Sequence, residues 1–363
     1  MARFIAFYLP QYHPTPENNK WWGEGFTEWT NVARAQKLYR GHYQPKVPKD
    51  LGFYDLRLPE SRIAQAELAK EYGVEAFCYW HYWFGNGKQL LQRPFNEVVK
   101  SGKPDFPFCL AWANHSWAKK QFDKNGTQEI LMEQTYPGEQ DFIDHFYTML
   151  PAFKDKRYVK VNGKLLFVVY NPLDKPILKQ FLNTWQRLAK ENGLNGFYFV
   201  GKSDKGRFRQ EILNFGYDAV YNDAVLNVHH NQTLIYKILL EFRARFLKYP
   251  KIFKYKNAIK YMLSDAEKAE NAIPVIAPNW DHTPRSGARG ILLHDCQPIY
   301  FKKLVKNVLE IIKDKPKEKQ IVFIKAWNEW GEGNYMEPDL KYGKGMLEAL
   351  KEAVQEQKDS QCY

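Results

Sequence analysis

Two glutamates near the end of the chain have the residue types and surroundings that cleavage of a glycosidic bond needs. Glu329 and Glu332 lie three residues apart within the segment Trp327 to Gly333, among tryptophans and glycines. A carboxyl pair cleaves such a bond when one group is protonated and the other is ionised. Adjacent apolar rings raise one pKa by desolvation, and mutual repulsion separates the two pKa values further. The spacing leaves the distance between the carboxyl groups open, because three residues span one helical turn or roughly 10 Å of extended chain.

The elements that must position these glutamates follow a regular alternation. Short apolar runs without in-and-out alternation are typical of parallel strands that are buried on both faces. Strands are predicted at 3–9, 74–83, 107–113, 165–170, 196–200, 218–222, 273–277 and 320–327. Amphipathic helices are predicted at 59–72, 94–100, 137–153, 176–192, 207–214, 232–262, 298–313 and 344–356. This order predicts an α/β fold, a (β/α)₈ TIM barrel with long loops after the strands, and we expect residues 1–363 to form a single domain.

The motifs of the chain give no support to a nucleotide or metal cofactor. The rival architecture, an open doubly wound sheet, usually has a glycine-rich first turn, whereas residues 9–13 read Leu-Pro-Gln-Tyr-His. Residues 196–203 match the Walker A letters, but their middle is itself the predicted strand, and a phosphate-binding loop follows its strand. HExxH, Asp-x-Asp and paired Cys/His ligand motifs are missing from the sequence. We therefore expect no cofactor and no catalytic metal.

The C-terminal ends of the predicted strands carry many aromatic, amide and acidic side chains. Catalytic groups of TIM barrels lie at these ends and on the following loops, and such side chains suit polyhydroxylated ligands. The first loop, residues 10–58, is unusually long and is predicted to form one wall of the site, with a packed loop anchored by tryptophans as the alternative. Glu329 and Glu332 are predicted as catalytic. The residues predicted to bind substrate are Tyr12, Trp22, Glu28, Trp29, Trp80, His81, Tyr82, Trp112, Asn114, His115, Tyr170, Asn222, Trp280, Asp281, Trp327, Asn328 and Trp330.

The composition is that of a globular chain with excess positive charge. Hydrophobic residues make up 44% and charged residues 26%, which excludes disorder and coiled coil as the dominant state. The start of the chain has no leader pattern, and the four cysteines form no CxxC pair, so we expect a cytoplasmic location. The net charge of +12 does not by itself specify a partner, and we expect no nucleic-acid partner.

Basic and aromatic residues are concentrated in one segment, residues 237–260. Eight lysines and arginines stand there against the single acidic residue Glu241. Two interpretations remain open for this segment. A basic amphipathic helix with aromatic residues can lie peripherally on the anionic inner face of a membrane, or it can be a solvated helix on the flank of the barrel.

The segment 327–333 resembles the corresponding motif of the WbsX-type proteins of bacterial surface-polysaccharide gene clusters. These proteins are in turn similar to glycoside hydrolase family 99, the endo-α-mannosidases. Residues 6–14, 25–32, 112–114, 279–281 and 284–285 also match the family pattern. The resemblance therefore covers most of the chain.

The resemblance implies a (β/α)₈ barrel that acts without a metal on an oligosaccharide or polysaccharide. It implies retaining cleavage, or transglycosylation, of an internal glycosidic bond in a bacterial surface glycan, in which the sugar's own 2-hydroxyl attacks the anomeric carbon. In that scheme the glutamate matching Glu329 deprotonates the hydroxyl, and the one matching Glu332 is the general acid and then the base. Many relatives have an acidic residue where this chain has His115, so the sugar is left open. A glycosyltransferase of O-antigen or capsule biosynthesis and a non-catalytic glycan-binding barrel are the alternatives.

Overall fold

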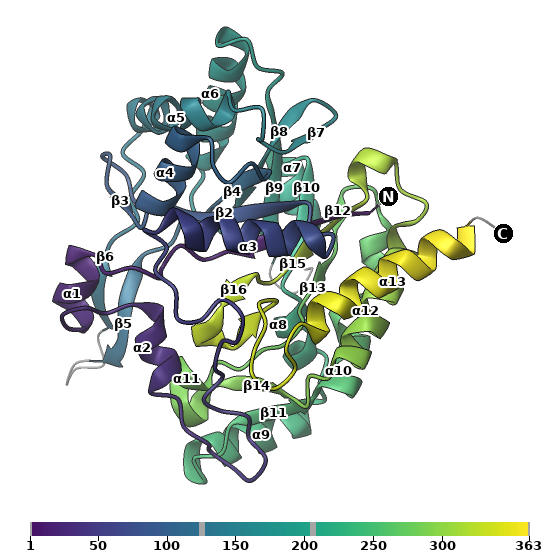
Figure 1. The fold of residues 1–363 in the computed structure, drawn as a ribbon. Coiled ribbons are helices and arrows are strands. Elements are labelled where there is room, and N and C mark those ends of the chain that lie inside the picture. Colours follow the sequence, from purple (N-terminus) through teal and green to yellow (C-terminus); the bar gives the residue numbers. More distant parts are fainter. Residues whose placement is uncertain (1, 123–127, 204–207, 362–363) are drawn as a thin grey trace.

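The computed structural model describes residues 2–122, 128–203 and 208–361, and its centre is a parallel β-barrel (Figure 1). The strands follow the order β12-β10-β9-β8-β4-β2-β1-β15-β13. The two ends of this path, β12 (Ala272–Ile273) and β13 (Val275–Ile276), belong to one stretch of chain that Pro274 divides. Because β12 pairs with β10 and β13 pairs with β15, both in parallel, this stretch closes the barrel. The predicted (β/α)₈ barrel is confirmed.

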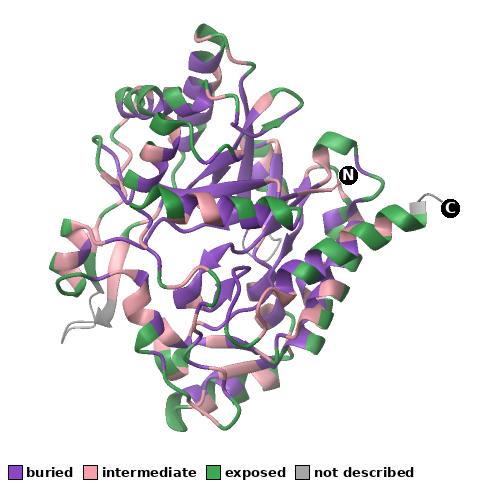
Figure 2. Ribbon diagram, viewed as in Figure 1, coloured by how far each residue is buried: buried purple, intermediate pink, exposed green. Residues whose placement is uncertain are grey.

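Every predicted strand is present, with bounds that differ from the prediction by three residues at most. These strands are buried along almost their whole length, as the purple arrows of Figure 2 show. The remaining barrel strands are β1 (Arg3–Tyr8), β2 (Ala76–Trp83), β4 (Phe108–Trp112), β8 (Lys164–Val169), β9 (Phe197–Ser203), β10 (Ala219–Asn222) and β15 (Ile321–Ile324).

Helices follow the strands along the chain, as predicted. The start of the predicted helix 207–214 includes residue 207, which lies outside the described residues. Within the described ranges, every helix is too short or too polar to cross a membrane. The helices that match the prediction are α3 (Pro59–Glu71), α4 (Arg93–Ser101), α5 (Glu139–Phe153), α6 (Leu178–Glu191), α7 (Arg209–Phe215), α12 (Pro298–Ile312) and α13 (Gly345–Gln361).

The helical stretch predicted over 232–262 is wrong in its middle. After α8 (Ala224–His230), the chain forms α9 (Leu234–Phe246), then strand β11 (Lys251–Lys254), then α10 (Tyr255–Met262). Pro250 has no backbone N–H and cannot continue a helix. Strand β11 instead pairs in parallel with β14 (Ile291–His294), outside the barrel. A partner 40 residues along the chain therefore decides the conformation of this segment.

The loops at the C-terminal ends of the strands have structure of their own. The first loop contains α1 (Pro16–Trp22), whose N-terminus is capped by the Thr15 hydroxyl, and α2 (Glu28–Ala33). The loop after β4 contains β5 (Trp117–Phe122) and β6 (Gln128–Met132), which pair in antiparallel fashion. After β15, β16 (Asn328–Glu329) and β17 (Asn334–Tyr335) flank the short 3₁₀ helix η4 (Trp330–Glu332).

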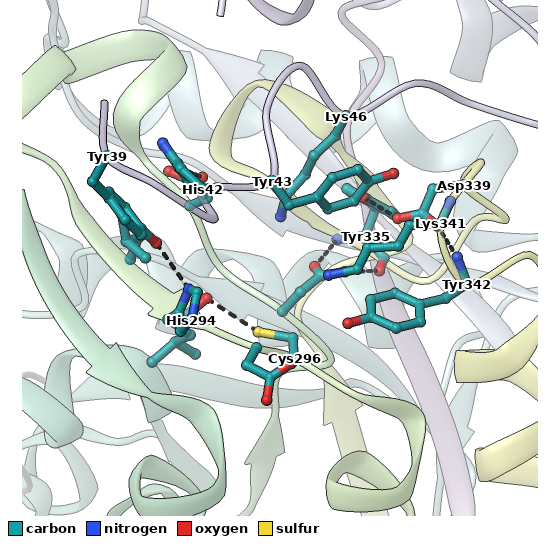
Figure 3. Close-up of a pocket in the computed structure, with 15 residues that line it drawn as sticks. Tyr39, His42, Tyr43, Lys46, His294, Cys296, Tyr335, Asp339, Lys341 and Tyr342 are labelled. Carbon is teal, nitrogen blue, oxygen red and sulfur yellow. Dashed lines mark hydrogen bonds and ion pairs between the residues drawn. The ribbon is translucent and has the colours of Figure 1, made fainter. Parts of the chain in front are cut away.

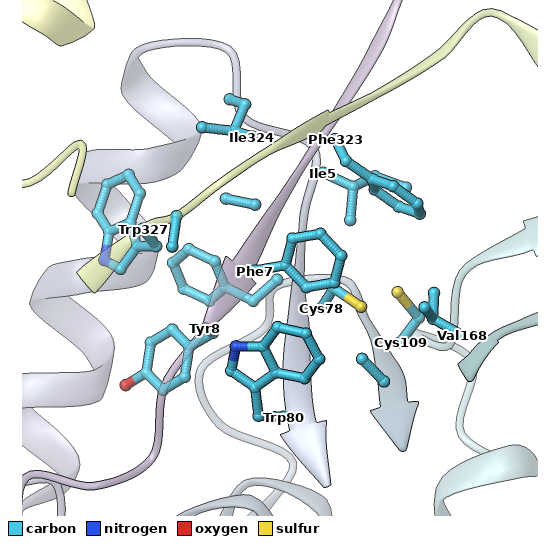
Figure 4. Packing of buried hydrophobic residues seen from close by; sticks show 14 of the residues in the cluster. Ile5, Phe7, Tyr8, Cys78, Trp80, Cys109, Val168, Phe323, Ile324 and Trp327 are labelled. Carbon is cyan, nitrogen blue, oxygen red and sulfur yellow. The ribbon is translucent and has the colours of Figure 1, made fainter. Parts of the chain in front are cut away.

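Aromatic side chains pack both the interior of the barrel and the layer between barrel and helices. Inside the barrel, the Phe7 ring stacks on Trp80 at 4.8 Å and contacts Phe323 at 5.1 Å (Figure 4). In the outer layer, Trp185 of α6 is fully buried, and its ring centroid lies 4.8 Å from that of Phe167 on β8. The Trp185 indole N–H donates to the carbonyl of Phe142 at 2.9 Å, which joins α6 to α5.

We predict that Trp185→Ala lowers the free energy of unfolding by about 3 to 5 kcal/mol, because it leaves a large cavity and removes the hydrogen bond to Phe142. Urea unfolding followed by circular dichroism measures the change. Tyr147→Ala on α5 is the control, since its side chain is 48% exposed. Equal effects of the two substitutions would contradict the packing role of Trp185.

Candidate active site

A cleft of about 1040 Å³ lies where the C-terminal ends of the barrel strands meet the first loop. Residues from α1, α2 and the segment between them line one side of it, and residues of β5 and β6 line another. The two sides contact each other through Trp21 and Trp117, whose ring centroids are 5.9 Å apart. The predicted site residues that line the cleft are Trp22, Glu28, Trp80, Tyr82, His115, Tyr170, Trp280, Glu329 and Glu332.

Glu329 lies at the base of the cleft with a neutral hydrogen-bond donor. Its side chain is buried, and its Oε1 accepts a hydrogen bond from the Trp80 indole N–H at 2.6 Å. Burial and the negative charge of Glu332 raise the pKa of Glu329 to about 7. This carboxyl group can therefore gain or lose a proton near neutral pH.

Glu332 has a cationic partner and behaves in the opposite way. Its Oε1 lies 2.5 Å from Arg285 Nη1 and 3.6 Å from His282 Nε2. Burial opposes ionisation, but the Arg285 charge and the nearby His282 imidazole outweigh it and hold the pKa of Glu332 well below its ordinary value. The two glutamates of the motif thus favour different protonation states.

Arg285 is held in turn by a second acidic residue, Glu28 of α2. Arg285 Nε lies 3.0 Å from Glu28 Oε1, and Nη2 lies 2.8 Å from Oε2. Glu28 also packs against the backbone of the glutamate motif, where a Cβ atom at Gly331 would lie 1.7 Å from Glu28 Oε1. Glycine at position 331 therefore permits the approach that places Arg285 beside Glu332.

A second ion pair lies in the same cleft. Lys325 Nζ is 2.9 Å from Asp223 Oδ2 and 5.0 Å from the centroid of the Trp280 ring. The other Asp223 oxygen accepts hydrogen bonds from the backbone N–H groups of Val225 and Leu226 and so caps α8. Burial opposes ionisation of Asp223, but Lys325 lowers its pKa below the ordinary value.

Arg285, His282, Asp223 and Lys325 line the cleft although none is among the predicted site residues. Asp223, His282 and Arg285 follow predicted strands in the chain, and Lys325 lies near the end of another. These positions are the signal that could have found them. Among the described residues, no group of three or more His, Cys, Asp or Glu side chains could hold a metal ion.

Ten predicted site residues do not line the cleft, and the alternation of side chains along a strand explains several of them. Trp80 and Tyr82 line the cleft, whereas His81 between them contacts His145 of α5, with their Nε2 atoms 2.7 Å apart. Burial lowers the pKa of His81 to about 3.

After β4, Ala113, His115 and Ser116 line the cleft, whereas Trp112 and Asn114 do not. The Asn114 amide donates to the carbonyl of Asn171 at 2.9 Å, and the Trp112 indole donates to the carbonyl of Trp83 at 2.9 Å. At the end of β10, Asn222 donates to Glu267 at 3.0 Å. These side chains join neighbouring strand ends to each other or to the surrounding segments.

Four more of these ten residues hold the turn that carries the glutamates. Asn328 accepts from the backbone N–H of Leu9 at 2.7 Å and donates to its carbonyl at 3.1 Å. The Tyr12 hydroxyl donates to the Asn328 carbonyl and accepts from the Trp330 N–H. Trp29 contacts Tyr12 and Trp330 with its ring. The turn is therefore fixed to the end of β1.

The last two, Trp327 and Asp281, face away from the cleft. Trp327 is fully buried against Phe77, at 5.1 Å between ring centroids. Asp281 borders a separate cavity of about 40 Å³, which Figure 3 shows with His42 and Lys46. That these ten residues contact the substrate stays a prediction made from the sequence.

The cluster around Asp281 supports the turn from behind. Asp281 Oδ2 lies 2.7 Å from His42 Nε2 and accepts from the Gln44 amide at 2.8 Å. Its backbone N–H donates to the Glu332 carbonyl at 2.7 Å, and Lys46 donates to the Gly333 carbonyl at 2.9 Å. Asp281 thus acts on the position of Glu332 through the backbone.

Comparison with known proteins connects the chain to bacterial proteins of greater length. The family model described as Glycosyltransferase WbsX matches residues 4–350. The protein WxcX of Xanthomonas campestris pv. campestris strain B100 is 35% identical over 361 residues, covering 97% of this chain and 50% of WxcX. WxcX of strain ATCC 33913 is 34% identical over the same shares of both chains. The chain thus spans about half the length of these relatives.

Solved structures share the fold at low identity. The family GH99 endo-α-mannosidase from Bacteroides thetaiotaomicron, in complex with bis-tris-propane, has a TM-score of 0.60 at 15% identity, covering 99% of this chain and 98% of that chain. A glycoside hydrolase-like protein has a TM-score of 0.58 at 16% identity, covering 97% of this chain and 93% of that chain. At this identity the likeness shows a common fold and nothing more.

We predict that Glu329→Gln changes the pH dependence of stability. The raised pKa means that folded Glu329 binds a proton that the unfolded chain releases, so its contribution to stability is lost as pH rises from about 4.5 to about 7. The free energy of unfolding of the variant minus that of the wild type should therefore increase by on the order of 3 kcal/mol from pH 4 to pH 8.

Urea unfolding at several pH values measures this difference. Burial also raises the pKa of Glu337 to about 7. Its contribution to the pH dependence of stability is the same in both proteins and cancels in the difference. Glu348→Gln on the exposed side of α13 is the matched control. A stability difference between Glu329→Gln and wild type that does not vary with pH would exclude the raised pKa.

Proposed function

The chain belongs to the family described as Glycosyltransferase WbsX, as its motifs predicted, and we propose that it cleaves, or transglycosylates at, an internal glycosidic bond of a bacterial surface glycan. The observation that carries the proposal is the presence of Glu329 and Glu332 in one cleft with opposite pKa shifts. Acid and base catalysis on one bond needs this separation. We also propose that residues 1–363 form a single domain.

The walls of the cleft support a sugar polymer as the ligand. Trp80, Tyr170 and Trp280 present aromatic rings beside the two glutamates, and Trp22 lies at the side formed by the first loop. Flat amphipathic rings pack against the apolar faces of sugars. A volume of about 1040 Å³ is at the upper limit for small-molecule sites, which favours several sugar units over one.

Glu329 suits the role of the base that the resemblance implies. A base works best when its pKa lies near the working pH, and the pKa of Glu329 is about 7. We assign to it removal of the proton from the sugar's 2-hydroxyl, which then attacks the anomeric carbon as the bond to the leaving oxygen breaks.

Glu332 fits the role of general acid only if Arg285 releases it. Arg285 favours the ionised form of Glu332, which cannot donate a proton. Glu28 holds Arg285 through two further nitrogen atoms and can keep its charge compensated when the contact with Glu332 breaks. We therefore assign to Glu28 the role of holding Arg285 while Glu332 protonates the leaving oxygen and afterwards activates the incoming water or sugar hydroxyl.

Glycosyl transfer from an activated sugar is the second candidate, and the family description favours it. The two reactions differ in the leaving group, a glycan in one and an activating group such as a nucleotide in the other. Product analysis with glycans and calorimetry with nucleotide sugars distinguish them. Saturable binding of a nucleotide sugar without glycan turnover would favour the transferase, and glycan binding without turnover of either donor would favour a non-catalytic barrel.

We predict that Glu329→Gln and Glu332→Gln each lower kcat/KM by about 10² to 10⁴. The amide retains the volume of the carboxyl group but cannot exchange a proton. Initial rates on a panel of bacterial surface glycans measure the effect, and circular dichroism checks the fold. Glu133→Gln, an exposed glutamate outside the cleft, is the control. A variant of either cleft glutamate with wild-type activity would remove that residue from the mechanism.

The pH profile gives a further prediction. The reaction needs one proton on the Glu329 and Glu332 pair, and this proton is lost as pH rises through about 7. We therefore expect kcat/KM of the wild type to fall about tenfold for each pH unit above that value. Initial rates between pH 5 and pH 9 test this, and a flat profile across neutrality would contradict it.

A further inference from the structure

Helix α9 exposes an unusual number of large apolar side chains. Ile235 is 81% exposed, Ile238 61%, Phe242 53% and Phe246 65%. The opposite side of the same helix packs on the protein through Leu240, which is 2% exposed, and Ala244, which is 7% exposed. At about 100° per residue, the exposed apolar residues form one outward face. Figure 2 shows the exposed side of this helix in green at the lower edge of the molecule.

This outward face is too continuous to be ordinary surface. Leu234 and Leu239, 73% and 47% exposed, extend it, so that it covers an arc of roughly 140°. Single exposed apolar side chains are common, but a continuous exposed patch indicates a surface that binds something. Arg245 is a charged residue within the arc, near one of its edges.

The surroundings of this face are strongly basic. Residues 237–260 contain eight lysines and arginines and one acidic residue, Glu241. Glu241 is already paired with Lys251 and leaves most of the positive charge uncompensated. Among the basic residues, Arg245, Lys248, Lys254, Lys256 and Lys260 are exposed. Exposed positive charge is therefore carried by α9 itself and by the segments that follow it in the chain.

We propose that α9 docks on the surface of a membrane that contains anionic lipids. An apolar face close in the chain to exposed lysines and arginines suits the boundary between charged headgroups and acyl chains. A helix of 13 residues is about 20 Å long, which is too short to span a bilayer, so it lies in the plane of the surface. The proposal does not depend on the reaction in the cleft.

The docking helix follows closely in the chain after a helix that lines the cleft. Helix α8 ends at His230 and α9 begins at Leu234, so a short turn joins them. Leu226 of α8 lines the cleft. The helix that would contact lipid is therefore the next helix in the chain after one that lines the cleft.

Co-sedimentation of the full chain with lipid vesicles tests the proposal. We expect binding to phosphatidylcholine vesicles containing phosphatidylglycerol that exceeds binding to pure phosphatidylcholine on the order of tenfold or more at low salt, and that falls at high salt. The triple variant Ile235→Ser, Ile238→Ser, Phe242→Ser should lose this binding. The variant Lys248→Gln, Lys254→Gln, Lys256→Gln should lose most of the salt-dependent part.

The matched control replaces apolar residues of similar exposure on other elements. Leu58, Ile299 and Leu340 are 53%, 62% and 63% exposed, and Leu58→Ser, Ile299→Ser, Leu340→Ser should bind vesicles as the wild type does. Thermal unfolding of each variant checks that the fold is retained. Loss of binding in the control as well would overturn the assignment to α9.

Two other results would overturn the proposal. One is no binding of the wild type to anionic vesicles at low salt. The other is a dimer in sedimentation velocity that the α9 triple variant abolishes, because a second copy of the chain would then cover the apolar face. A fluorescent label at Leu239→Cys, in a Cys362→Ser background, should shift to the blue with anionic vesicles. Cys78, Cys109 and Cys296 are buried and should stay unlabelled.

Discussion

The chemistry of the cleft depends on the position of one cation, Arg285, between Glu28 and Glu332. Two of its nitrogen atoms contact Glu28 and a third contacts Glu332. Removing one partner from a buried ion pair leaves an uncompensated charge and is strongly destabilising. The three residues come from α2, from the segment after β13 and from η4, so the barrel must close before this arrangement exists.

The difference between the two motif glutamates follows from what each one contacts. Glu332 meets a guanidinium group, whereas the hydrogen bond described for Glu329 comes from the neutral Trp80 indole. Lys325 also acts on Glu329, but its ammonium group is engaged with Asp223. Because an indole N–H compensates a negative charge less than a cation does, burial raises the pKa of Glu329, whereas at Glu332 the guanidinium charge and the nearby His282 together outweigh burial.

The turn that holds the glutamates is stabilised mainly by buried neutral contacts. Asn328 makes two hydrogen bonds to the backbone of Leu9, and the Tyr12 hydroxyl bonds the backbone on both sides of Glu329. Trp330 donates to Glu337 at 2.6 Å and stacks on Tyr335 at 3.7 Å. Such a support holds the carboxyl groups in place without placing another charge in the cleft. The apolar face of α9 lies outside this arrangement and has no comparable partner within the described residues.

The sequence alone determined the barrel and the glutamate pair, because both signals are local. Each barrel strand is a continuous apolar run between turn residues, and Glu329 and Glu332 stand in one short motif. Strand β11 could not be foreseen, since its pairing with β14 decides it. Which strand-end residues line the cleft depended on the alternation of side chains, as at Trp80 and His81. Only the tertiary structure brought Arg285 to Glu28 and Glu332, because ion pairs between distant segments leave no periodic pattern in the sequence.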